Sequence, residues 1–206
     1  MTQPPDTQPR RIHDLVAIAG ARYPDRPAVS SENGAALRYA GLLDEIAACA
    51  ADLQDAGLRP GDRLLILAEN APALPILLMA ASRLGAIAIP VNARMTVSEI
   101  SRIADHADPR LTVYLSAVSP AARDHASTAN AALVALAGAA MHCGPARETR
   151  PEKVENGPEM TAVILYTTGT TGLPKGVMLS HGNLAFGGLS SARLRGIGPE
   201  DVIYGV

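Results

Sequence analysis

Apolar residues recur along the chain in alternating helical and extended patterns. Spacings of three and four residues predict four helices, over residues 11–22, 40–56, 72–84 and 97–107. Short apolar runs between them predict three buried strands, over residues 63–68, 86–90 and 111–115. Helices that alternate with strands at these intervals predict an α/β fold, with a mostly parallel sheet and helices on both of its faces.

Two local motifs refine this pattern. Strand candidates at residues 27–30 and 35–39 flank an Asn-Gly pair at residues 33–34, which favours a β-hairpin. Thr96 and Glu99 form a capping-box pattern at the start of the fourth helix. The apolar positions that this helix is expected to direct inward are Val97, Ile100, Ile103 and Ala104.

The second half of the chain is less regular. Residues 117–142 are alanine-rich and predict a helix within 120–130 and a short strand near 133–136. A polar, proline-rich stretch at residues 144–159 predicts a long surface connection. The last predicted elements are a strand at 161–166, a strand at 177–179 and a helix at 183–194.

Composition narrows the classes of function. The 206 residues carry 18 basic and 20 acidic side chains, which gives no basic face for nucleic acid. The apolar stretch 71–91 is interrupted by prolines and by Arg83, so a helix and a strand explain it better than a membrane span.

Cys49 and Cys143 lack metal-ligand spacing and are expected to be reduced thiols in a cytoplasmic protein. Residues 1–10 are expected to form a disordered tail.

The strongest chemical signal is the loop at residues 166–176. The stretch from Thr167 to Gly176 contains four threonines, three glycines and one lysine, Lys175. Glycines allow backbone amides to turn towards an anion, and threonine hydroxyls add further donors. Because a lysine supplies a mobile positive charge, this combination predicts a binding site for a polyphosphate.

Other phosphate-binding motifs do not match this loop. The P-loop of nucleoside triphosphatases requires Gly-Lys-Ser/Thr, whereas Lys175 lies between Pro174 and Gly176, and no G-x-G-x-x-G pattern is present. The simpler alternative is an ordinary polar hairpin loop. Such loops seldom need three glycines, four threonines and a lysine within ten residues, so we favour the phosphate interpretation.

Other polar residues receive structural interpretations. His181 is expected to help start the last helix, whose first amides need acceptors. His106 and His125 are expected to be solvated. Asn92 and Arg94, which follow a predicted strand, are expected to stabilise a turn.

Residues 164–184, ILYTTGTTGLPKGVMLSHGNL, resemble the signature of the adenylate-forming superfamily. This superfamily comprises acyl-CoA synthetases, luciferases and the adenylation domains of peptide synthetases. The only departure from the usual core is Thr168 in place of serine, which keeps the hydroxyl. Softer similarity to the family's early α/β subdomain extends to residues 61–67, 84–92 and 94–99. The whole looks most like an acyl-CoA synthetase of the fatty-acid or aromatic-acid type.

The resemblance implies ATP-dependent activation of a carboxylic acid. In such enzymes a carboxylate attacks the α-phosphorus of ATP, pyrophosphate leaves, and a thiol such as coenzyme A then takes the acyl group from the acyl-adenylate. The residues that the resemblance assigns to the ATP phosphates are Thr167, Thr168, Gly169, Thr170, Thr171, Gly172 and Lys175. Mg²⁺ is also implied, but the family's magnesium-linked glutamate and catalytic lysine have no counterpart in this sequence.

Residues 11–206 are therefore expected to be the N-terminal portion of an AMP-binding domain that is incomplete at its C-terminus. Two functions stay open. The chain is either the ATP-phosphate portion of an acid–thiol ligase, or a catalytically inactive fragment or interaction module derived from one. We expect the isolated chain to be inactive, and we expect uncovered apolar faces to promote self-association.

Overall fold

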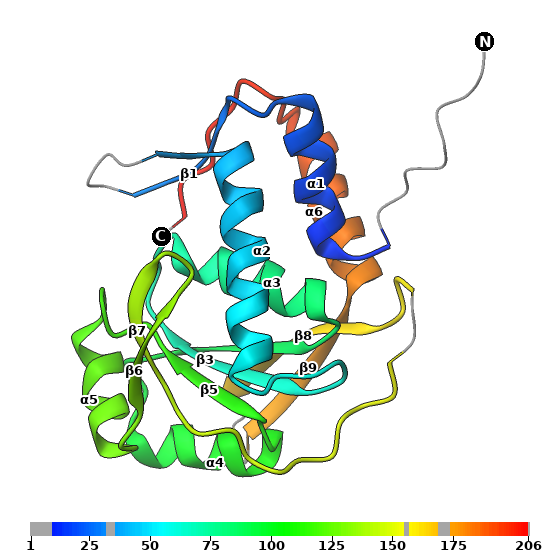
Figure 1. Ribbon diagram of the computed structural model, residues 1–206. Helices are drawn as coiled ribbons and strands as arrows, with labels where there is room; N and C mark the ends of the chain where they lie inside the picture. The colour runs from blue at the N-terminus through cyan, green and yellow to red at the C-terminus, as the bar shows by residue number, and fades with distance from the viewer. Residues whose placement is uncertain (1–9, 32–35, 155–156, 169–173, 206) are drawn as a thin grey trace.

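The computed structural model describes residues 10–31, 36–154, 157–168 and 174–205 (Figure 1). Nine of the ten residues assigned to the N-terminal tail lie outside these ranges, so the structure does not test that prediction. Of the predicted phosphate loop, residues 169–173 also lie outside them.

A seven-stranded sheet forms the centre of the molecule, with strand order β6-β7-β5-β3-β4-β8-β9. Its strands are β3 (Arg63–Ala68), β4 (Ile87–Asn92), β5 (Leu111–Tyr114), β6 (Ala132–Leu136), β7 (Ala139–Cys143), β8 (Thr161–Thr168) and β9 (Pro174–Ser180). The four central strands β5, β3, β4 and β8 are mutually parallel. β7 and β6 add to one side, and β9 to the other, in antiparallel orientation.

Helices cover both faces of this sheet (Figure 1). One layer consists of α1 (Ile12–Arg22), α2 (Tyr39–Asp55), α3 (Ala73–Leu84) and α6 (His181–Arg195). The opposite layer consists of α4 (Val97–Ala107) and α5 (Pro120–Thr128). The predicted α/β fold with a mostly parallel sheet is confirmed in its central strands.

Alternation along β3 shows why its sequence is apolar throughout. Leu64 and Ile66 pack into the core beneath α2 and α3, whereas Leu65 and Leu67 pack into the core beneath α4 and α5. Successive side chains of a strand point to opposite faces, and here both faces are buried. A continuous apolar run is therefore the pattern that a central parallel strand requires.

The predicted N-terminal hairpin is also present. β1 (Pro27–Ser30) and β2 (Ala36–Arg38) pair in antiparallel orientation and form a separate two-stranded sheet. The Asn-Gly turn assigned to residues 33–34 lies outside the described residues.

The hairpin formed by β6 and β7 was only half predicted. The strand near 133–136 is present as β6, but β7 was missed. Its turn consists of Ala137 and Gly138, whose φ angles are 50° and 68°. Two positive φ values match a type I′ hairpin turn, but alanine is not a residue that announces one. The local sequence therefore gave no hairpin signal.

The capping box of α4 is confirmed. The Thr96 side chain accepts from the Glu99 amide, and the Thr96 amide donates to Glu99 Oε2 at 2.8 Å. The inward placement is correct for Ile103, which is buried, but wrong for Val97, which is 56% exposed. Val97 is the first residue of the helix and lies beside an open gap between α4 and α5, which leaves its side chain exposed.

Residues 144–154 of the predicted long connection have no regular secondary structure and pass the first residues of β3 and β5. Near its middle, the Glu152 amide donates to the Gly61 carbonyl at 2.8 Å, and the Glu152 carboxylate pairs with Arg63 Nη2 at 2.8 Å. Near its start, the Arg147 amide donates to the Arg110 carbonyl. These contacts fasten a stretch without regular secondary structure to the strands that it crosses.

Candidate functional site

The predicted phosphate loop joins two paired strands. β8 and β9 form an antiparallel hairpin in which Thr167 lies opposite Lys175, and Thr168 lies opposite Pro174. Side chains directly opposite each other share a face and have Cβ atoms about 5 Å apart. Thr167 and Lys175 are both exposed. A hydroxyl donor and an ammonium group are therefore brought together at the end of the hairpin.

Of the seven predicted phosphate residues, the structure thus juxtaposes Thr167 and Lys175 and places the backbone of Thr168 next to them. The others, Gly169, Thr170, Thr171 and Gly172, lie outside the described residues. Their role stays a prediction. The phosphate role of Thr167, Thr168 and Lys175 likewise stays a prediction, although the structure brings these three motif residues together in the paired strands.

Tyr166, which immediately precedes the site, lies on the opposite face of β8. Its hydroxyl is 2.7 Å from Nδ1 of His106 on α4, and the two rings meet edge to face with centroids 5.7 Å apart. Burial raises the pKa of the Tyr166 phenol, and the nearby positive charge of Arg63 partly opposes this shift. His106 is exposed, as expected, but it is also bonded to the hairpin, which the sequence did not indicate.

His181 begins α6 directly after the hairpin and is 1% exposed. Its Nδ1 accepts the Ile12 amide at 3.3 Å, so the neutral ring carries its proton on Nε2. Nε2 is buried without a hydrogen-bond partner among the described residues. Burial lowers the pKa of His181 to about 4, and positive charge on Arg11 and His13 acts in the same direction.

His181 therefore does sit at the helix start, but its contact reaches back to α1. The N-cap itself is Ser180, which accepts from the Asn183 amide at 3.1 Å, while the Asn183 side chain accepts from the Ser180 amide. The prediction that this region starts the helix is confirmed. The histidine joins the helix that follows the hairpin to the N-terminal helix.

Asn92 and Arg94 stabilise the turn after β4, as predicted. Asn92 Oδ1 accepts the Arg94 amide at 2.9 Å, and Arg94 Nε donates to Glu69 at 2.5 Å. Glu69 also accepts from the Ser119 hydroxyl at 2.7 Å. The Ser119 hydrogen bond, followed by that of Arg94, lowers the pKa of Glu69.

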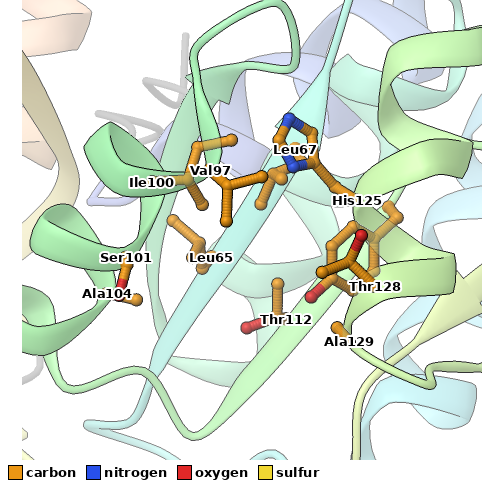
Figure 2. Close-up of a pocket in the computed structure, with 11 residues that line it drawn as sticks. Leu65, Leu67, Val97, Ile100, Ser101, Ala104, Thr112, His125, Thr128 and Ala129 are labelled. Carbon is orange, nitrogen blue, oxygen red and sulfur yellow. The ribbon is translucent and has the colours of Figure 1, made fainter.

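A separate pocket of about 200 Å³ lies between α4 and α5 (Figure 2). Leu65 and Leu67 form its floor, Val97 lies at its rim and His125 reaches it from α5. His125 Nε2 lies 3.1 Å from the Ala93 carbonyl and 3.0 Å from the Met95 carbonyl. The expectation that His125 is solvated is therefore wrong, because these carbonyls hold it in place. None of the predicted phosphate residues lines this pocket.

Within the described ranges, no group of three or more His, Cys, Asp or Glu side chains lies close enough to hold a metal ion. Among the described residues, no helix combines the length and apolar character needed to cross a membrane.

Both cysteines are buried and unpaired, and burial is the main cause that raises the pKa of Cys49 to about 12.

Solved structures share this architecture. The crystal structure of VinN superposes with a TM-score of 0.72 at 27% identity, covering 95% of this chain and 50% of VinN. ATP-bound MatB from Rhodopseudomonas palustris gives a TM-score of 0.66 at 26% identity, covering 86% of this chain and 36% of MatB. The fold is thus that of the N-terminal part of an adenylate-forming enzyme.

The chain belongs to the AMP-binding enzyme family, whose model matches residues 16–206. A feruloyl-CoA synthase from an Amycolatopsis species is 36% identical over 176 residues, covering 82% of this chain and 33% of the relative. An L-proline–[L-prolyl-carrier protein] ligase from Pseudomonas fluorescens is 34% identical over 186 residues, covering 85% of this chain and 36% of the relative. The chain therefore spans about a third of the length of these curated relatives.

Proposed function

We propose that this chain supplies the ATP-phosphate site of an acid-activating ligase, with coenzyme A or another carrier thiol as the acyl acceptor. The observation that carries the proposal is the pairing of Thr167 with Lys175 at the end of the β8–β9 hairpin. Relatives named as CoA and carrier-protein ligases support the reaction class, and the ATP-bound state of MatB supports the nucleotide.

In this proposal the hairpin acts by electrostatics and positioning. Lys175 is exposed, so its ammonium group can pair with the β- and γ-phosphates without first breaking a buried ion pair. The Thr167 hydroxyl on the same face donates to a phosphate oxygen. Charge held in this way favours release of pyrophosphate when a carboxylate attacks the α-phosphorus. The proposal assigns no Mg²⁺ ligand to the described residues, because they contain no suitable cluster.

Lys175→Ala should weaken binding of ATP and of tripolyphosphate by the 206-residue chain about tenfold, the loss expected for a charge-assisted hydrogen bond. Isothermal titration calorimetry at low ionic strength measures this effect directly. Lys153→Ala is the matched control, since it removes the other lysine of the chain, which lies in the connecting segment before β8 and not in the hairpin. We expect its affinity to equal that of the unaltered chain, and equal losses in both variants would contradict the proposal.

A second assay on the isolated 206-residue chain distinguishes ATP binding from catalysis. We expect no acid-dependent exchange of pyrophosphate into ATP above background for the isolated chain, because the family's catalytic lysine has no counterpart in it. Exchange that Lys175→Ala abolishes would instead show that the chain activates acids by itself.

A second candidate is an interaction module, which exposed apolar side chains on α6 favour. Phe186 is 75% exposed, Leu194 is 88% exposed and Leu189 is 46% exposed. These residues lie on the helix that directly follows β9, the edge strand of the described sheet, and exposed apolar surface promotes association. The occupant that we propose is a second copy of the chain.

Sedimentation equilibrium should therefore show concentration-dependent association of the unaltered chain. Replacing Phe186 and Leu194 by serine should shift the population towards monomer. Val118→Ser is the control, because Val118 is 58% exposed but lies elsewhere, ahead of α5. A strictly monomeric unaltered chain, or an equal shift in the control, would exclude this surface as the contact.

A further inference from the structure

The side chains of Tyr166 and His106 are far apart in sequence, and their contact connects the β8–β9 hairpin to helix α4. Tyr166 lies on β8, one residue before Thr167, and His106 lies in the last turn of α4. The phenol oxygen and the imidazole Nδ1 are 2.7 Å apart. Sixty residues separate them, so this contact exists only in the folded chain.

The paired strand β9 leaves space for the ring of Tyr166. Gly176 is the direct cross-strand partner of Tyr166. A Cβ on Gly176 would lie 2.8 Å from Ile164 Cγ2 and 3.2 Å from the ring carbon Cζ of Tyr166. The absence of a side chain at position 176 therefore lets the ring lie across β9 and reach α4.

The alternation of side chains links this contact to the phosphate site. Tyr166 and Ile164 face the core under α4, so Thr167 and its partner Lys175 face the other way. Fixing the Tyr166 ring fixes the rotation of the strand about its axis, and hence the direction in which Thr167 points. The hairpin lies at the sheet edge, where no further strand of the described sheet holds β9.

We propose that Tyr166 and His106 are positioning residues that orient the phosphate hairpin from behind, by anchoring it to α4. In this anchor the phenolic O–H donates to Nδ1, so the ring proton lies on Nε2. The part of the inference that concerns phosphate rests on the proposed function. The anchoring itself does not.

The test uses substitutions that change one atom group at a time. Tyr166→Phe keeps the ring and removes the hydroxyl. His106→Leu removes the acceptor, whereas His106→Asn restores an acceptor at the same distance along the side chain, because Oδ1 of asparagine takes the place of Nδ1. His106 is exposed and Tyr166→Phe keeps the half-buried ring, so all three variants should keep the fold. Ser101→Ala, at an exposed position of the same helix, is the control.

Amide hydrogen exchange of peptides from residues 161–168 and 174–180 is measured without any ligand. Loss of one hydrogen bond should speed exchange in these peptides about two- to tenfold in Tyr166→Phe and in His106→Leu. The asparagine variant and the control should exchange at the rate of the unaltered chain. Tripolyphosphate affinity should fall by a similar factor in the first two variants and recover with asparagine.

Unchanged hairpin exchange in Tyr166→Phe would overturn the assignment, as would an asparagine variant that exchanges as fast as the leucine variant. Rescue by asparagine is the result that a merely structural role of the imidazole ring would not produce. If the unaltered chain fails to bind tripolyphosphate, the proposed function fails, and the exchange rates still decide whether the anchor exists.

Discussion

Lowering the pH from 7 to 5 is expected to reduce the free energy of unfolding by about 2 kcal/mol through His181 alone. Burial lowers the pKa of this histidine to about 4 in the folded chain. In the unfolded chain an exposed histidine has an ordinary pKa of about 6.5. Between these two values the unfolded state binds a proton that the folded state does not, so stability falls as the pH falls through this window.

The packing around His181 explains why the folded state resists protonation. Nδ1 is occupied by the amide of Ile12, so a second proton would have to displace this bond. Arg11 and His13 add positive charge nearby, and the negative charge of Asp14 partly opposes them. Burial also lowers the pKa of His13, which acts in the same direction over the same pH range.

Urea unfolding at pH 7, 6 and 5 measures this dependence. The range ends above the region in which carboxylates titrate, so the lowered pKa of Glu69 and of Glu99 contributes little. His181→Asn is the matched variant, because its Oδ1 can accept the Ile12 amide but cannot titrate. We expect the asparagine variant to lose about 2 kcal/mol less than the unaltered chain over this range. Identical pH profiles would show that His181 is not the responsible group.

Gly61→Ala is expected to destabilise the fold by about 3 kcal/mol. Gly61 has a φ of 83°, a conformation that costs other L-residues about 1–2 kcal/mol. A Cβ at this position would also lie 2.2 Å from the Glu152 carbonyl oxygen. The connecting segment must therefore move away, which weakens the bond of the Glu152 amide to Gly61 and the ion pair with Arg63.

The matched control for this substitution is Gly144→Ala. Gly144 begins the same connecting segment, but a Cβ there meets the Thr112 carbonyl oxygen at an ordinary 3.7 Å, and its φ is not positive. Urea midpoints of both variants are compared with that of the unaltered chain. We expect a change below about 1 kcal/mol for Gly144→Ala. A Gly61→Ala variant as stable as this control would mean that the segment is not fastened at residue 61.

The candidate site was predictable to the extent that its chemistry is local. Thr167 and Lys175 were named together because both belong to one short motif, and the structure pairs them on one face of the hairpin. The contact between Tyr166 and His106, on the other face of the hairpin, could not be predicted from the sequence. Nothing near Tyr166 in the sequence distinguishes His106 from any other exposed histidine, and the sequence interpretation of His106 as simply solvated missed its bond.

The sequence by itself determined the helices, the central strands and the capping box at Thr96, and it named Thr167 and Lys175 as members of one motif. Each of these depends on periodicity or on groups within a few residues, and such local preferences act before the chain is packed. The tertiary structure alone decided the bond between Ile12 and His181, the contact of Gly61 with Glu152 and the partner of Tyr166. These depend on which elements become neighbours in the sheet order, and that order is set by packing of the whole core and not by any one segment.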